Sequence, residues 1–171
     1  SLQLILEGSG LVLTEAELHE LAERKNRRYV ELLGRLGPSD VLPGVRELLG
    51  ELEAAGVAVA LGSASRNAPT VLSRLGLAGR FAAVVDPALV FRGKPEPETF
   101  ERAAHALGLL TDECVGVEDA AAGVEAVVGA GMAAVGVGSE ATLGAAHLVV
   151  PDASSLTLAR LREAHARAFP R

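Results

Sequence analysis

Short apolar runs alternate with helix-like stretches along most of this chain, and this alternation limits its fold more than any other feature of the sequence. Strands that alternate with helices form βαβ units with right-handed crossovers, and such units assemble into a parallel sheet. The runs that we expect to form strands are residues 57–61, 82–85, 114–117, 133–137 and 148–150. The stretches that we expect to form helices around them are residues 45–55, 68–75, 97–107, 121–130 and 156–168. The sequence therefore predicts an α/β fold with a Rossmann-like parallel sheet and helices on both of its faces.

The N-terminal part of the chain differs from the rest because its apolar residues follow helical spacing. Thr14 and Glu17 have the spacing of a capping box, which predicts the start of a long helix. We expect a shorter helix over residues 1–7. Glycine and proline then interrupt the helical pattern. The predicted organisation is thus a helical part, a linker and an α/β domain, over residues 1–36, 37–43 and 44–171.

Composition excludes several classes of protein. The 171 residues are 49% hydrophobic, which is enough for a packed core and excludes a wholly disordered chain. The net charge of -6 argues against a protein that coats nucleic acid, and no apolar run is long enough to span a membrane. The single cysteine, Cys114, excludes an internal disulfide framework. Because no stretch of the sequence resembles a signal peptide, we expect a cytoplasmic protein that acts on a small molecule. The sequence does not specify an oligomeric state and is compatible with a monomer.

Ligands of open parallel sheets bind beyond the carboxyl ends of the strands, so the residues directly after each predicted strand are the first candidates for a site. The run 57–61 is wholly apolar, which is typical of a strand buried on both faces of a parallel sheet. The turn that follows it contains Ser63, Ser65, Arg66 and Asn67. Its hydroxyl and N–H groups can hold an anion such as phosphate, although the same residues also suit a polar turn that caps the next helix.

Two further strand ends carry charged residues. Lys94 lies in a proline-rich loop, and Lys25 and Lys94 are the only lysines among 16 basic residues. A lysine in a rigid loop suits a phosphate or carboxylate ligand, or it is simply a solvated loop residue. Glu118 and Asp119 follow another strand, and adjacent carboxylates there suit Mg²⁺, which prefers oxygen ligands. In the plainer alternative, Asp119 caps the next helix and Glu118 is solvated.

Together, the three strand ends provide hydroxyls, a lysine and a carboxylate pair, which are the groups needed to hold a phosphoryl group beside magnesium. In this order and at these places they resemble the motifs of the haloacid dehalogenase superfamily of phosphotransferases. The resemblance implies that Ser63 contacts the transferring phosphoryl group and that Lys94 balances charge between nucleophile and phosphate. It also implies that Glu118 and Asp119 bind or support Mg²⁺ as the cofactor.

Within this superfamily the chain resembles the β-phosphoglucomutase-like subgroup, through residues 24–26, 63–67, 86–88 and 151–152. This closer resemblance implies that Ser65, Arg66 and Asn67 help to hold a second, non-reacting phosphate. It also implies that the helical part is the C-terminal part of a helical cap domain, from which Lys25 reaches the substrate, and that the α/β domain is the core. Arg66 stands where the subgroup usually has a lysine, which keeps the charge but changes its geometry.

One element of the superfamily pattern is absent from this sequence. No Asp-x-Asp motif occurs in it, although the resemblance implies that the first aspartate of this motif is the nucleophile and the second is the general acid and base. The motif belongs on the central strand of the sheet, between the strands that end at Ser63 and at Val117. We therefore expect it upstream of Ser1 in a longer enzyme, and we expect the sheet of this chain to lack its central strand.

The activity that the resemblance implies is a mutase reaction, the interconversion of β-D-glucose 1-phosphate and glucose 6-phosphate through a phospho-aspartyl enzyme and a bisphosphate intermediate. The cluster of Ser65, Arg66 and Asn67 favours this reaction, because a mutase must hold a second phosphate. A phosphatase acting on a sugar phosphate or another small phosphate monoester uses the same core and is the first alternative. A catalytically incomplete phosphate-binding or regulatory module is the second.

Overall fold

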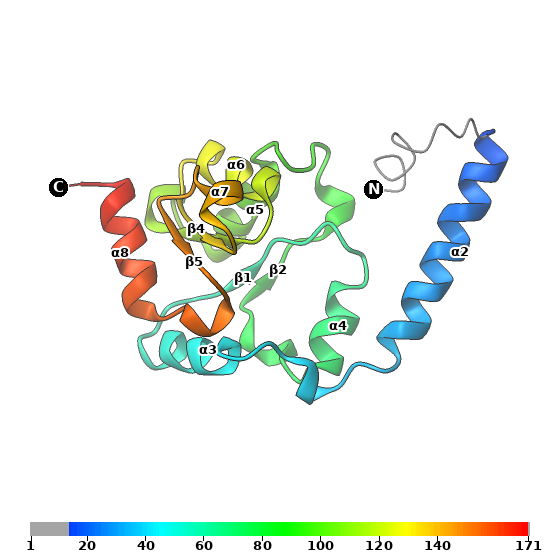
Figure 1. Cartoon of the computed structure of the whole chain (residues 1–171), viewed down its shortest axis with the longest axis horizontal. Helices are drawn as coiled ribbons and strands as arrows, with labels where there is room; N and C mark the ends of the chain where they lie inside the picture. The colour runs from blue at the N-terminus through cyan, green and yellow to red at the C-terminus, as the bar shows by residue number, and fades with distance from the viewer. Residues whose placement is uncertain (1–13, 171) are drawn as a thin grey trace.

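A computed structural model of the chain describes residues 14–170. The α/β part contains two parallel sheets (Figure 1). The smaller sheet pairs β1 (Ala60–Leu61) with β2 (Ala83–Val84). The larger sheet has the order β3–β4–β5 and consists of β3 (Val115–Glu118), β4 (Ala133–Val137) and β5 (Leu148–Val150). Glu118, at the carboxyl end of β3, lies opposite Gly136 of β4.

Helices cover both faces of the larger sheet, as predicted. The described helices are α2 (Glu15–Leu33), α3 (Val45–Ala54), α4 (Ala68–Arg74), α5 (Glu98–Leu107), α6 (Ala121–Gly129), α7 (Glu140–Leu143) and α8 (Leu158–Ala168). Successive residues of β4 face opposite layers, so that Ala134 packs with α5 and α6 whereas Val135 packs with α3 and α8. Both residues are almost completely buried. A parallel strand covered in this way reads as a continuous apolar run, which is why the sequence predicts β4 well.

The first strand is shorter and more exposed than the sequence predicts. The prediction is a strand over residues 57–61 that is buried on both faces, but β1 covers only the last two of these residues and Val57 is 42% exposed. The reason is that β1 has a neighbour, β2, on one edge only. Among residues 14–170 no strand lies between β1 and β3, and Val117 of β3 is likewise partly exposed. The described part of the chain therefore has the expected gap at the centre of its sheet.

Helix α2 begins as predicted, at the capping box. The Thr14 N–H donates to Glu17 Oε2 at 2.8 Å, and the Glu17 N–H donates to Thr14 Oγ1 at 3.3 Å. The helix extends away from the two sheets (Figure 1). Arg74 of α4 donates to the Gly34 carbonyl, just beyond the C-terminal end of α2, at 3.4 Å. The short helix expected over residues 1–7 lies outside the described residues.

The other predicted bounds agree with the structure to within two residues, whereas α7 is missed because four residues carry little periodic signal. The predicted linker contains a short 3-10 turn, Pro38–Asp40. Gly44, which follows the linker, has a φ of 85° in the left-handed region, and its backbone packs closely against Ser154. Of the helices described between residues 14 and 170, none combines the length and the apolar character needed to cross a membrane.

Candidate functional site

The structure joins two of the predicted strand ends through an ion pair. Lys94 Nζ, from the loop before α5, donates to Glu118 Oε1 at the end of β3. The Glu118 side chain is 10% exposed and the Lys94 side chain is 26% exposed, so the pair is largely withdrawn from water. Lys94 is therefore not an ordinary solvated loop residue, and Glu118 is not solvated. The positive charge of Lys94 offsets the repulsion between Glu118 and the adjacent Asp119.

Phe100 of α5 links this ion pair to the end of β1. The Lys94 ammonium lies 4.8 Å from the centroid of the Phe100 ring, a distance at which a cation and an aromatic face attract each other. A Cβ built on Gly62 would lie 3.8 Å from the same ring, so the turn after β1 also approaches it. Phe100 is 8% exposed and belongs to the core. The Lys94 loop and the turn after β1 thus meet at one aromatic ring, and the ion pair joins the end of β3 to this loop.

The serines of the turn after β1 shape its backbone. Ser63 Oγ accepts the N–H of Ser65 at 3.1 Å, and Ser65 Oγ accepts the N–H of Asn67 at 3.2 Å. Because each hydroxyl oxygen acts here as an acceptor, its hydrogen stays available to donate to a ligand. Helix α4 begins after Asn67 with no side-chain cap in the described structure, so these serines do not serve as its N-cap. The Arg66 side chain is exposed beside them.

Glu118 lies directly against the first turn of α6. A Cβ built on Gly123 would be 2.3 Å from the Glu118 carboxyl carbon, so only glycine leaves room for the carboxylate. Glu118 Oε2 also accepts the N–H of Asp119 at 3.3 Å. The N-cap residue of α6 is Ala120, so Asp119 does not cap this helix. Asp119 is exposed, and the structure describes no hydrogen bond to its carboxylate within residues 14–170.

The donor set at this strand end suits a hard cation. Glu118 and Asp119 supply carboxylate oxygens, which are ligands that Mg²⁺ prefers. Among residues 14–170 there is no cluster of three or more histidine, cysteine, aspartate or glutamate side chains that would hold a metal on its own. One or two carboxylates suffice for Mg²⁺, because it usually keeps several waters and binds substrate phosphates as well. The two carboxylates therefore fit such an ion.

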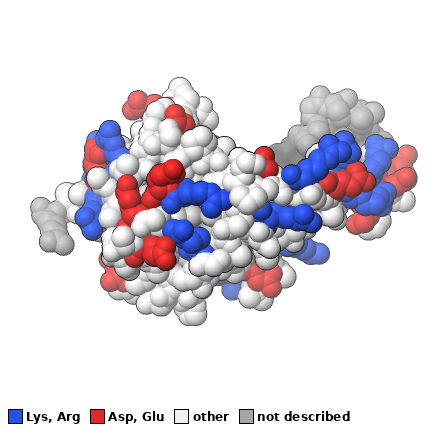
Figure 2. Space-filling model, turned by 90° about the horizontal axis from the view of Figure 1, so that it is seen from below, with Lys and Arg blue, Asp and Glu red and all other residues white. Residues whose placement is uncertain are grey.

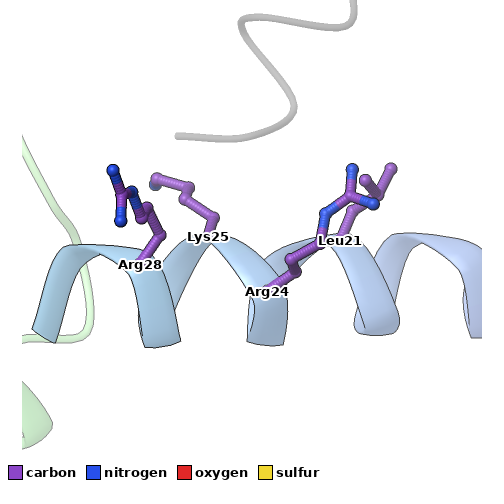
Figure 3. A pocket seen from close by; sticks show the side chains of 4 residues that line it. All are labelled: Leu21, Arg24, Lys25 and Arg28. Atoms are coloured by element: carbon purple, nitrogen blue, oxygen red, sulfur yellow. The ribbon is translucent and has the colours of Figure 1, made fainter. Parts of the chain in front are cut away.

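Lys25 is a predicted site residue that the structure does not bring to the Lys94–Glu118 pair. It lies in the middle of α2, which stands away from the sheets (Figure 1). Leu21, Arg24, Lys25 and Arg28 line an open hollow along one side of this helix (Figure 3). Basic side chains, interspersed with acidic ones, run along this end of the molecule (Figure 2). Lys25 and its basic neighbours Arg24 and Arg28 are thus separate from the strand-end site.

Comparison with known proteins finds related sequences and structures. A family model described as haloacid dehalogenase-like hydrolase matches residues 4–131. Over 160 residues the chain is 44% identical to a β-phosphoglucomutase of Bacillus subtilis (strain 168), covering 94% of this chain and 71% of that protein. Over 128 residues it is 37% identical to a fructose-1-phosphate phosphatase of Escherichia coli (strain K12), covering 73% and 66%. A crystal structure of β-phosphoglucomutase from Clostridium difficile matches with a TM-score of 0.87 at 35% identity, covering 93% of this chain and 71% of that one.

Proposed function

This chain belongs to the haloacid dehalogenase-like hydrolase family, and on that premise we propose that it carries the strand ends of a phosphoryl-transfer site for a sugar phosphate. The observation that carries the proposal is the largely buried ion pair of Lys94 and Glu118, whose lysine lies against the same Phe100 ring that Gly62, in the turn after β1, approaches. Within the family we propose β-phosphoglucomutase activity, the interconversion of β-D-glucose 1-phosphate and glucose 6-phosphate. The 44% identity to the Bacillus subtilis β-phosphoglucomutase supports this choice.

We propose separate roles for the residues at the strand ends. The Lys94 ammonium attracts the oxygens of the transferring phosphoryl group, where negative charge develops, and the Ser63 hydroxyl donates a hydrogen bond to one of them. Such groups are most effective when they are held in place before the reaction, in a site that excludes water. The contacts of Lys94 with Glu118 and Phe100 supply this preorganisation.

A mutase must also hold the phosphate that is not reacting. We propose that Ser65, Arg66 and Asn67 bind it, since Arg66 is exposed and free to reach a ligand beside the turn. We further propose that residues 1–36 belong to a cap domain joined by the linker 37–43 to the core domain, and that Lys25 contacts the substrate when the cap closes. Closure of a cap over the site excludes water that would otherwise hydrolyse the phosphoryl-enzyme.

We propose that Glu118 and Asp119 hold Mg²⁺, which would neutralise negative charge on the phosphoryl oxygens. The reaction also needs an aspartate nucleophile that takes the phosphoryl group, passes it to a substrate hydroxyl to form a bisphosphate, and accepts the other phosphate in return. We propose that a strand between β1 and β3 presents this aspartate, because the facing edges of these two strands are unpaired in the described structure. Such a strand would place the aspartate at the same sheet edge as Lys94.

The product of the reaction tests the proposed activity. The product of the complete gene that encodes this chain is incubated with β-D-glucose 1-phosphate and Mg²⁺, and glucose 6-phosphate and free phosphate are both measured. We expect glucose 6-phosphate as the dominant product. Dominant release of free phosphate would overturn the mutase in favour of a phosphatase, the activity of the Escherichia coli relative. Binding of the sugar phosphate without turnover would identify a binding or regulatory module instead.

Asp119→Asn tests the metal assignment. The substitution removes a charge but keeps the size of the side chain, so we expect the Mg²⁺ concentration for half-maximal activity to rise by at least about tenfold. Because Asp119 is exposed, its replacement should leave the free energy of unfolding nearly unchanged. Asp112→Asn is the matched control, since Asp112 is also an exposed aspartate next to a strand of the larger sheet. An unchanged Mg²⁺ dependence in Asp119→Asn would show that this residue is not a ligand.

A further inference from the structure

Glu98, the first residue of α5, is a buried carboxylate to which the proposed site gives no role. Its two oxygens accept four hydrogen bonds. Oε2 accepts the backbone N–H groups of Phe91 at 3.1 Å and Arg92 at 2.8 Å. Oε1 accepts Nε and Nη2 of Arg102 at 2.9 and 2.7 Å. The Arg102 guanidinium and, next, the Arg92 N–H hold the pKa of Glu98 below its usual range.

These hydrogen bonds close the loop that carries Lys94. Phe91 and Arg92 stand at the beginning of the loop, and Glu98 stands at its end. Phe91 is 84% exposed, and the described contact of its ring is with the guanidinium of the same Arg102, 5.8 Å from the ring centroid. The ion pair of Arg92 with Glu96 is also exposed, at 3.8 Å, and such pairs contribute little. In the described structure the Glu98 carboxylate and its partner Arg102 therefore tie the two ends of this loop together.

The same turn of α5 also supplies the ring against which Lys94 rests. Phe100 follows Glu98 by two residues, and its ring lies 4.8 Å from the Lys94 ammonium. One helix turn thus holds the base of the loop and contacts the lysine, while Glu118 is the ionic partner of that lysine. We propose that Glu98, itself held by Arg102, is a positioning residue that places Lys94 against Glu118. The inference rests on the proposed function for its catalytic consequence, whereas the placement of Lys94 can be tested without it.

Chemical labelling of lysine measures this placement directly. The complete gene product is treated with an acetylating reagent, and peptide mass spectrometry follows the rates at Lys94 and at the exposed Lys25, which serves as the internal reference. Glu98→Gln keeps the size of the side chain but loses its charge and one acceptor. We expect it to raise the rate at Lys94 relative to Lys25 by on the order of fivefold, because the loop opens more often. Arg102→Gln should act in the same direction with a smaller effect, and it tests the inference even if Glu98→Gln fails to fold.

Glu163→Gln is the matched control. Glu163 also accepts hydrogen bonds from two arginines, Arg160 and Arg167, but it lies on α8 and has no described contact with the Lys94 loop. We expect the ratio of the labelling rates at Lys94 and Lys25 in Glu163→Gln to equal that of the wild type.

The kinetics of Glu98→Gln test the catalytic consequence. In turnover of β-D-glucose 1-phosphate, this substitution should lower kcat by about tenfold with KM nearly unchanged, because a misplaced catalytic group affects the transition state most.

The two readouts separate the two proposals. An unchanged labelling ratio in both Glu98→Gln and Arg102→Gln would overturn the positioning role. If the ratio rises in these variants while the wild-type protein shows no phosphoryl transfer, the positioning role is supported and the proposed function alone is overturned.

Discussion

Replacing Lys94 with alanine is expected to lower the kcat of the complete gene product on β-D-glucose 1-phosphate by about 10²–10³-fold. The Lys94 ammonium lies where the strand ends meet, between Glu118 and the Phe100 ring. Without it, the negative charge that develops on the phosphoryl oxygens loses a fixed partner in a place largely withdrawn from water. The substitution also leaves Glu118 without its cation, so the free energy of unfolding should fall by roughly 1–3 kcal/mol. Steady-state kinetics and urea denaturation measure the two effects.

Lys25→Ala is the matched control, because it makes the same chemical change at the other lysine of the chain. Lys25 is exposed on α2, so its loss should leave the free energy of unfolding unchanged. In the proposed mechanism it contacts the substrate from the cap, so KM should rise more than kcat falls. A kcat for Lys94→Ala close to that of the wild type would contradict the assignment of Lys94 to the reacting phosphoryl group.

Replacing Gly123 with alanine is expected to have a similarly large effect although it changes no charged side chain. The new Cβ would lie 2.3 Å from the carboxyl carbon of Glu118, so either this carboxylate or the start of α6 must move. Movement of Glu118 displaces Lys94, its partner in the ion pair. We expect kcat to fall by about 10²-fold, as for other small misplacements of catalytic groups. Overpacking should lower the free energy of unfolding by about 1–3 kcal/mol.

Gly129→Ala provides the control for this experiment on the same helix. A Cβ on Gly129 would have its nearest neighbour, a carbon of Pro97, at 3.8 Å, which is an ordinary contact. Alanine also favours helix over glycine, so the free energy of unfolding should stay constant or rise by about 0.5–1 kcal/mol. Activity should be retained. Equal losses of activity in the two variants would contradict the view that the place of Glu118 depends on the bare backbone at Gly123.

The sequence predicts much of the fold because most elements are specified locally. The capping box at Thr14 fixes the start of α2, and β4 is a continuous apolar run because helices cover both of its faces. The same reasoning fails for residues 57–61, which are equally apolar. Their burial depends on a strand beside β1, and the described chain has none on that edge. A local pattern cannot reveal whether such a neighbour is present.

The candidate site is predictable in part, because a general rule of parallel sheets supplies what local patterns cannot. The rule that ligands bind at the carboxyl ends of parallel strands brings Lys94 and Glu118 to one edge, although 24 residues separate them. The roles of Phe100 and Glu98 are not predicted in this way. A phenylalanine in a helix is usually a core residue, and a glutamate in the first turn usually stabilises only the start of the helix. The spacing of Glu98 and Arg102 indicates an ion pair along α5, but nothing local shows that the carboxylate also holds the loop backbone.

A crystal structure of the complete gene product grown with Mn²⁺ and inorganic phosphate tests the central claim most directly. The claim is that the ends of β1 and β3 and the Lys94 loop form one phosphoryl-transfer site. We expect the anomalous signal of Mn²⁺, a substitute for Mg²⁺, beside Asp119 or Glu118. We expect the phosphate within hydrogen-bonding distance of Ser63 Oγ and Lys94 Nζ. Phosphate and Mn²⁺ bound elsewhere in the molecule, with this sheet edge empty, would contradict the account.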